Sequence, residues 1–113
     1  MEIITEAITL ATLREMAGRK FGDMVKAVVD IDRGIMAVDA ELHADEEGLL
    51  LENGSRQTSL WGINIYPEMA GDDWLEFDSL INLRPSQGNR SRGVDDPQIR
   101  ERIRGTVSRL IRR

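Results

Sequence analysis

Two runs of β-branched residues joined by a tight turn restrict this chain most strongly to a fold with an antiparallel sheet. The runs are residues 24–31 and 35–38, and Asp-Arg-Gly at positions 32–34 connects them. Glycine can adopt the positive φ that such a short connection requires, so the sequence predicts a β-hairpin. One face of the first run is apolar throughout, whereas the other carries Lys26 and Asp30 and is only half apolar. We expect the first face to be buried and the second to be partly covered.

Local patterns predict further helices and strands on both sides of this hairpin. Thr9 is a suitable N-cap for a helix with one apolar face that ends near Gly18 and Gly22. A second helix is predicted to begin at Pro97 after Asp96, because apolar residues then recur about every four positions. The other predicted strands are residues 2–5, 60–66 and 74–83.

Residues 45–53 are compatible with two structures. Asp45 is a suitable cap for a helix that ends at Gly54. The run Gly-Leu-Leu-Leu at positions 48–51, followed by Asn53, equally suits a strand that enters a turn. We favour the strand.

The order of these elements predicts an α+β fold. A strand, a helix, several consecutive strands and a final helix give a largely antiparallel sheet of about five strands, with an N-terminal and a C-terminal helix packed on it. The simplest arrangement places both helices on one face. With 113 residues and 41% hydrophobic residues, the chain is expected to form a single domain over residues 1–113.

The two signs of charge are segregated along the chain, although the net charge is −5. From Arg84 onward, nine arginines and three acidic residues give a net charge of +6, whereas the preceding residues, with six basic and seventeen acidic side chains, carry −11. This distribution suits a local anion site or a homodimer better than nucleic-acid binding, which has weak support here. A solvent-exposed terminal helix is the alternative explanation of the basic segment.

The composition excludes several kinds of site. Without cysteine the chain has no disulfide, thiolate nucleophile or Cys-based metal centre, which is consistent with a reducing compartment. No signal peptide pattern is present, and no stretch approaches the ~20 apolar residues of a membrane span, so we expect a cytoplasmic protein with no membrane association. Glycine-rich nucleotide-binding fingerprints and the Gly-x-Ser-x-Gly elbow of many hydrolases are also missing.

Residues 84–93, Arg-Pro-Ser-Gln-Gly-Asn-Arg-Ser-Arg-Gly, are the candidate ligand-binding segment. Guanidinium groups bind carboxylates or phosphates through paired hydrogen bonds, and side-chain amides can contact a planar group. The segment also precedes the predicted helix at Pro97, whose unpaired N–H groups would favour an anion. The predicted ligand-binding residues are Arg84, Gln87, Asn89, Arg90 and Arg92. The alternative is that the arginines pair with Asp95 and Asp96 and that the polar residues only shape a loop.

His43 is the only histidine, so any mechanism that needs an imidazole must use it. Glu41, His43 and Asp45 alternate, and in an extended strand all three would lie on one face. In that arrangement they would form part of a divalent-cation site that Glu46 or Glu47 completes, or would act as an acid and a base. The alternative is an edge-strand histidine that is hydrogen-bonded to a carboxylate, with no metal. We favour this alternative, and the sequence indicates no cofactor.

Five runs of the chain resemble a family of small uncharacterised prokaryotic proteins that is classed as a domain of unknown function. The runs are Val-Val-Asp-Ile-Asp-Arg-Gly-Ile-Met-Ala (28–37), Glu-Leu-His-Ala-Asp (41–45), Gly-Ser-Arg-Gln (54–57), Leu-Trp-Gly (60–62) and Ile-Asn-Leu-Arg-Pro (81–85). The resemblance covers nearly the whole chain. It implies one compact domain, and it implies no reaction, ligand or catalytic residue.

Two functions of different classes are compatible with these observations, and we favour the first. In the first, the chain is a non-enzymatic binding module whose segment 84–92 grips an anionic small molecule or an acidic protein surface, such as that of a second copy. In the second, it is a small metal-dependent or acid/base-dependent hydrolase of a phosphorylated substrate, with Glu41, His43 and Asp45 as the reacting groups. The second function requires His43 and residues 84–93, which we call the arginine-rich loop, to converge in space.

Overall fold

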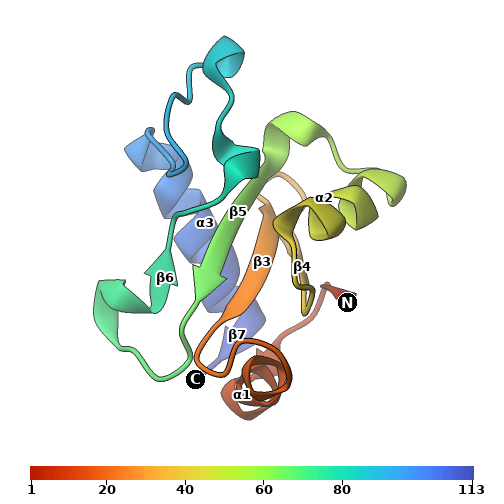
Figure 1. Cartoon of the computed structure of the whole chain (residues 1–113), viewed down its shortest axis with the longest axis vertical. Coiled ribbons are helices and arrows are strands. Elements are labelled where there is room, and N and C mark those ends of the chain that lie inside the picture. Colours follow the sequence, from red (N-terminus) through yellow and green to blue (C-terminus); the bar gives the residue numbers. More distant parts are fainter.

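A five-stranded antiparallel sheet lies at the centre of the molecule (Figure 1). The computed structural model describes residues 1–113. The strands, in spatial order, are β1 (Glu2–Ile4), β4 (Ile35–Val38), β3 (Val25–Asp30), β5 (Leu60–Ile65) and β6 (Leu75–Glu76). A separate parallel pair, β2 (Ile8–Thr9) and β7 (Ile111–Arg112), joins the two ends of the chain. This arrangement confirms the α+β fold that the sequence predicts.

Three α-helices cover the sheet: α1 (Leu10–Arg19), α2 (His43–Glu52) and α3 (Pro97–Leu110). Four short 3₁₀ turns complete the chain: η1 (Gln57–Ser59), η2 (Gly71–Trp74), η3 (Leu80–Asn82) and η4 (Pro85–Gln87). As predicted, α1 and α3 pack on the sheet, and they share one face. Figure 1 shows α2 on the near side of the sheet and α3 behind it. The two predicted helices therefore share one face as expected, whereas α2, which was not predicted, covers the other.

The core is divided by the sheet into two layers. The larger layer contains the apolar side chains of α1 and α3 together with alternate residues of β3, including Val25, Ala27 and Val29. The smaller layer lies between Val28 on the opposite face and Leu50 of α2. The half-apolar second face of the hairpin is thus covered, because α2 brings Leu50 onto it.

The predicted hairpin is confirmed as β3 and β4, which pair in the register Val28↔Ala37. Gly34 in the turn has a φ of 68°, the left-handed conformation for which glycine is suited. The predicted helix starts are confirmed too. The Thr9 hydroxyl accepts a hydrogen bond from the Thr12 N–H, and Asp96 accepts one from the N–H two residues later. These elements follow from interactions between residues that are close in sequence.

Residues 45–52 are helical and Asn53 caps the helix, so the strand predicted for residues 45–53 is wrong. The helical residues belong to α2, in which His43, Glu46 and Leu50 are buried. This spacing of three and four residues is the helical period, and it buries only one residue of the apolar run 49–51 completely. Three consecutive leucines suggested a strand because leucine is usually buried. In the helix, however, Leu49 is only partly buried and Leu51 is exposed.

The strand predicted for residues 74–83 is also much shorter than expected. Only β6 pairs with β5, and the chain then leaves the sheet and forms η3. The side chain of Asn82 takes the place of a strand beside Gly62, because it accepts from the Gly62 N–H at 2.8 Å and donates to the Gly62 carbonyl at 2.9 Å. A side chain therefore ends the sheet where the sequence pattern alone would continue it.

None of the three α-helices has both the length and the apolar character that a bilayer crossing needs.

Candidate functional site

The arginine-rich loop is held in shape mainly by Asn89. Its buried side-chain amide donates to the carbonyls of Asn82, Ser91 and Gly93 at 2.7–3.1 Å, and its oxygen accepts from the Asp95 N–H at 2.8 Å. All of its hydrogen-bonding groups are therefore occupied within the protein. These contacts favour a structural role for Asn89, while its role in ligand binding remains a prediction.

Arg84 lies inside the protein rather than on the loop surface. It is only 8% exposed, and its guanidinium donates to the carbonyls of Gln57 and Leu60 at 2.6 and 2.7 Å. The same group lies 4.2 Å from the centre of the Trp61 ring, which is a cation–π geometry. These contacts fix Arg84 beneath the loop and leave little of it for a ligand.

Arg90 and Arg92 differ in their surroundings although only one residue separates them. Arg92 donates to the Asp78 carboxylate at 2.8 Å in an exposed ion pair. The side chain of Arg90 is exposed and forms no ion pair, while its backbone N–H donates to Asp95 at 2.8 Å. Neither arginine pairs through its side chain with Asp95 or Asp96, so the pairing considered as an alternative is wrong.

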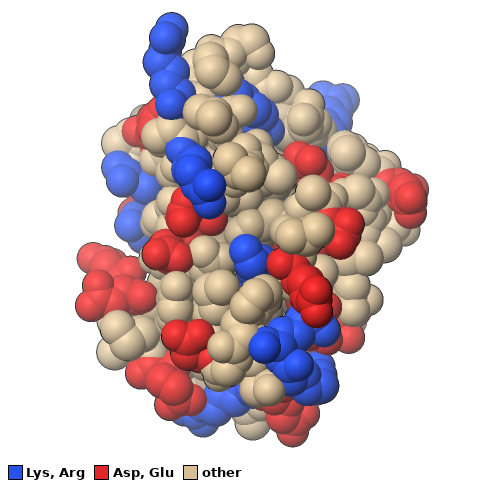
Figure 2. Space-filling view, in the orientation of Figure 1, with Lys and Arg blue, Asp and Glu red and all other residues tan.

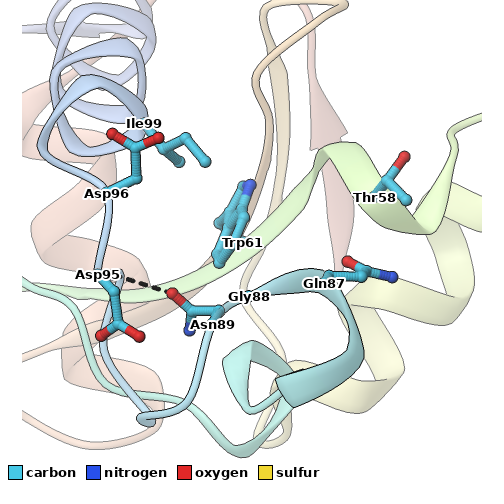
Figure 3. Close-up of a pocket in the computed structure, with 8 residues that line it drawn as sticks. All are labelled: Thr58, Trp61, Gln87, Gly88, Asn89, Asp95, Asp96 and Ile99. Atoms are coloured by element: carbon cyan, nitrogen blue, oxygen red, sulfur yellow. Dashed lines mark hydrogen bonds between the residues drawn. The ribbon is translucent and has the colours of Figure 1, made fainter.

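A cavity of about 320 Å³ lies between this loop and the start of α3 (Figure 3). Its lining residues are Thr58, Trp61, Gln87, Gly88, Asn89, Asp95, Asp96 and Ile99. Hydrogen bonds from the Ser91 hydroxyl and the Arg90 N–H hold the pKa of the Asp95 carboxyl below its usual value. Two carboxylates and no cation thus line the cavity, so its charge disfavours the anion predicted for this loop.

His43 does not share a strand face with Glu41 and Asp45, so this prediction is wrong. The histidine is the first residue of α2, Asp45 lies in the first helical turn, and Glu41 precedes the helix. Both carboxylates are exposed, whereas the imidazole is only 7% exposed. No group of three His, Asp or Glu side chains is placed to hold a metal ion. The possible cation site is therefore not formed. The favoured alternative, an edge-strand histidine bonded to a carboxylate, is wrong too, because His43 begins α2 and bonds the Ile63 carbonyl.

The orientation of His43 is fixed by β5. Its Nε2–H donates to the Ile63 carbonyl at 2.8 Å. Because a carbonyl only accepts, Nε2 carries the hydrogen and Nδ1 bears the lone pair in the neutral ring. Burial lowers the pKa of His43 below its usual value, so the ring is neutral at pH 7. Nδ1 has no protein partner and is not closed off from solvent, so it is an available acceptor.

A second cavity, of about 160 Å³, brings His43 and the arginine-rich loop together. We call it the basic pocket. It is lined by Lys26, Leu42, His43, Ala44, Ser79, Leu80, Ile81 and Arg92. Arg92 comes from the loop, His43 and Ala44 from the start of α2, and Lys26 from β3. His43 and the arginine-rich loop thus converge in this pocket, and Arg92 is the only residue of the loop that lines it.

The start of α2 at this pocket has no side-chain cap. Leu42 occupies the N-cap position, and no side chain accepts from the first N–H groups of the helix. The N–H groups of His43 and Ala44 have no hydrogen-bond partner, although such groups usually find one. The pocket therefore combines two cationic side chains with two unpaired donors at the positive end of a helix dipole.

The face that carries α2 has no general excess of either charge. Figure 2 shows basic and acidic side chains alternating over it, with no continuous area of one sign. A broad basic surface of the kind that binds nucleic acid is therefore not seen on this face. Any preference for anions here must be local to the basic pocket.

Sequence reasoning missed Lys26, Leu42 and Leu80 as members of a site. Lys26 was visible as the one cation on the half-apolar face of the hairpin, which is a usable signal. The two leucines gave no signal, because an exposed leucine is recognised only when the tertiary structure is known.

A family described as "Protein of unknown function (DUF5674)" matches residues 2–110, so the chain belongs to this family. The match confirms the resemblance to a domain of unknown function that the sequence predicted. No curated protein and no solved structure matches the chain.

Proposed function

We propose, since membership of this family assigns no activity, that the protein is a non-enzymatic module that binds a small anion in the basic pocket. The observation that carries this proposal is the convergence of Lys26 and Arg92 on the uncapped start of α2. The ligand would be an anionic small molecule or an acidic group of a partner protein.

The unpaired N–H groups at the start of α2 support an anion as the ligand. The helix dipole places roughly half a positive charge at this end, and the N–H groups of His43 and Ala44 point out of the helix without partners. An anion that accepts from them satisfies donors that otherwise depend on water. The neutral His43 ring adds no positive charge, so Lys26 and Arg92 supply the long-range attraction.

Arg92 is able to contribute despite its ion pair. The pair with Asp78 is about half exposed on both sides, and such pairs contribute only about 0–1 kcal/mol. An anion in the pocket can therefore share the guanidinium at little energetic cost. By contrast, the cavity in Figure 3 presents Asp95 and Asp96 and would repel the same anion.

The proposal is tested by titrating the protein with phosphate, sulfate and acetate while amide NMR shifts are recorded. We expect shifts centred on Ala44, and Lys26→Met is expected to weaken binding by roughly tenfold, the size of a charge-assisted hydrogen bond. Met has a similar length, and its thioether replaces the Lys26 ammonium, which lies 5.5 Å from the centre of the Phe21 ring in a cation–π contact.

Arg90→Met is the matched control, because it also removes one positive charge, from the loop that carries Arg92 but outside the pocket. It is expected to leave affinity within about twofold, the effect of a screened surface charge. A loss of binding in Arg90→Met with none in Lys26→Met would instead locate the anion at the loop, as the sequence first suggested. No shift with any anion would refute anion binding.

Acid/base hydrolysis of a phosphorylated substrate is the second candidate function, because His43 and Arg92 line one cavity. The Nδ1 lone pair of His43 is suitably placed to act as a general base on a water molecule in this pocket. Hydrolysis of p-nitrophenyl phosphate that is lost in His43→Gln would support it. Gln retains a donor for the Ile63 carbonyl, so a loss would not reflect a missing hydrogen bond.

A further inference from the structure

We propose that the anion of the basic pocket is an aliphatic monocarboxylate with a hydrogen-bond donor beside the carboxyl group, as in a 2-hydroxy or 2-acylamino acid. This inference rests on the proposed function and names the ligand class of the same site. Three separate observations on the pocket lead to it: its charge, its unused acceptor and its apolar rim.

The charge of the pocket suits a single negative charge. Arg92 is already paired with Asp78, whereas Lys26 takes part in no ion pair and its ammonium lies 5.5 Å from the centre of the Phe21 ring. One cation is therefore without a counter-charge, and the α2 dipole adds a partial positive charge. A carboxylate balances this charge, while a phosphate dianion would exceed it and face Asp78.

The acceptor that we assign to the ligand is Nδ1 of His43. This residue is 7% exposed and lines the cavity, and its Nε2–H is already donated to the Ile63 carbonyl. An acceptor disfavours a second carboxylate oxygen at this point and favours an O–H or N–H of the ligand. The N–H groups of His43 and Ala44 are donors, so they take the carboxylate itself. The ligand therefore carries a donor close to its carboxyl group.

The rim of the pocket is apolar. Leu42 and Leu80 both line it, although they are 58% and 67% exposed. Two exposed leucines beside two cationic side chains leave apolar surface for a ligand to cover. The volume of about 160 Å³ is far above the roughly 10–15 Å³ that a single water molecule needs. A carboxyl group and one short aliphatic chain fit this space.

The same chemistry is presented by a free 2-hydroxy acid and by the C-terminus of a polypeptide that ends in an aliphatic residue. Both have a carboxylate, a neighbouring O–H or N–H and an apolar side chain. The two sources are separated by comparing 2-hydroxy-4-methylpentanoate with N-acetyl-Gly-Leu. Tighter binding of the peptide would identify a polypeptide end as the ligand, and tighter binding of the hydroxy acid would identify a small molecule.

The test measures the affinity of the whole chain for four probes by NMR titration: 2-hydroxy-4-methylpentanoate, 4-methylpentanoate, glycolate and inorganic phosphate. We expect the first to bind best. Glycolate lacks the aliphatic chain and is expected to bind about tenfold more weakly. The acid without the hydroxyl is expected to lose about fivefold, as for one neutral hydrogen bond.

Two variants connect these differences to the residues. His43→Gln keeps a donor for the Ile63 carbonyl and removes Nδ1, so it should abolish the discrimination between the hydroxy acid and its deoxy analogue. Leu80→Ser, at an exposed position that should not affect folding, should reduce the preference for the aliphatic chain. Leu83→Ser is the matched control, because Leu83 is also exposed but lies outside the pocket.

The outcomes separate this inference from the proposed function. The inference would be overturned if phosphate or glycolate bound as tightly as 2-hydroxy-4-methylpentanoate. If Lys26→Met weakened the binding of that anion and of the hydroxy acid, the proposed anion site would still stand. Equal loss of the aliphatic preference in Leu83→Ser and Leu80→Ser would also contradict it. If none of the four probes binds, both the inference and the proposed function fail.

Discussion

Glu46 on α2 provides a test of the fold that is independent of any ligand. Its side chain is 0% exposed, one oxygen accepts from the Ala40 N–H at 3.1 Å, and the other has no partner. Burial raises the pKa of this carboxyl from 4.5 to about 9. The group is therefore protonated in the folded protein at pH 7 and releases its proton when the chain unfolds.

The sign and size of the effect on stability follow from this difference. Between pH 4.5 and pH 9 the folded state binds the proton and the unfolded state does not, so the free energy of unfolding decreases as pH rises. Each pH unit corresponds to about 1.36 kcal/mol, so this carboxyl lowers stability by about 3 kcal/mol between pH 4.5 and pH 7. The full contribution is present below pH 4.5 and is lost by pH 9.

The perturbation is Glu46→Gln, whose amide oxygen can still accept from Ala40. The assay is urea denaturation of both proteins at pH 5, 7 and 8.5. We expect the stability of the variant relative to the native chain to increase by about 1.4 kcal/mol per pH unit. Glu52→Gln, at an exposed position of the same helix, is the control and should show no such trend.

Comparing the two proteins at each pH removes the other titrating groups. Burial also lowers the pKa of His43, which makes stability rise with pH near its ordinary value of 6.5, but this occurs in both proteins. The same holds for Asp39, whose pKa is lowered, with its hydrogen bonds to Arg19 and Lys20 outweighing burial. A stability difference that stays constant from pH 5 to pH 8.5 would refute the reasoning, because it would mean that Glu46 is ionised in the fold.

Two further predictions concern the end of the sheet. Asn82→Ala is expected to reduce the free energy of unfolding by about 3–5 kcal/mol, because it leaves the buried N–H and carbonyl of Gly62 without partners. Urea denaturation measures this loss. The control is Asn53→Ala at an exposed position, which should reduce the free energy of unfolding by less than about 1 kcal/mol. Gly62→Ala places a Cβ 2.6 Å from the Ser79 Cβ and should destabilise by about 1–3 kcal/mol, with partial rescue by Ser79→Gly. Gly48→Ala, which meets no atom within 4 Å in α2, should stabilise instead, and equal effects of the two glycine variants on thermal unfolding would contradict this account.

The candidate site could be predicted only in part from the sequence. The unusual chemistry of the arginine-rich loop and the single histidine identified Arg92 and His43 as members of a site. The contacts of these two side chains could not be predicted, because they depend on where elements that are distant in sequence meet. Arg84 has the same residue type and lies in the same loop as Arg92, yet the cation–π contact with Trp61 places it in the interior.

The sequence by itself determined the elements whose signals are local. The hairpin turn at Gly34 and the start of α1 at Thr9 each depend on residues within a few positions, so their patterns fix them before the chain folds. The apolar stripe of α3 belongs to the same group, because its period is set by helix geometry.

Only the tertiary structure decided the features that depend on distant partners. Residues 43–52 form a helix because Leu50 reaches the second face of the sheet at Val28, a contact that neither segment predicts alone. The sheet ends early because the Asn82 side chain, twenty positions away, accepts from the Gly62 N–H where a further strand would otherwise pair. The basic pocket exists for the same reason, since Lys26, His43 and Arg92 are far apart in sequence and are brought together by packing on one face of the sheet.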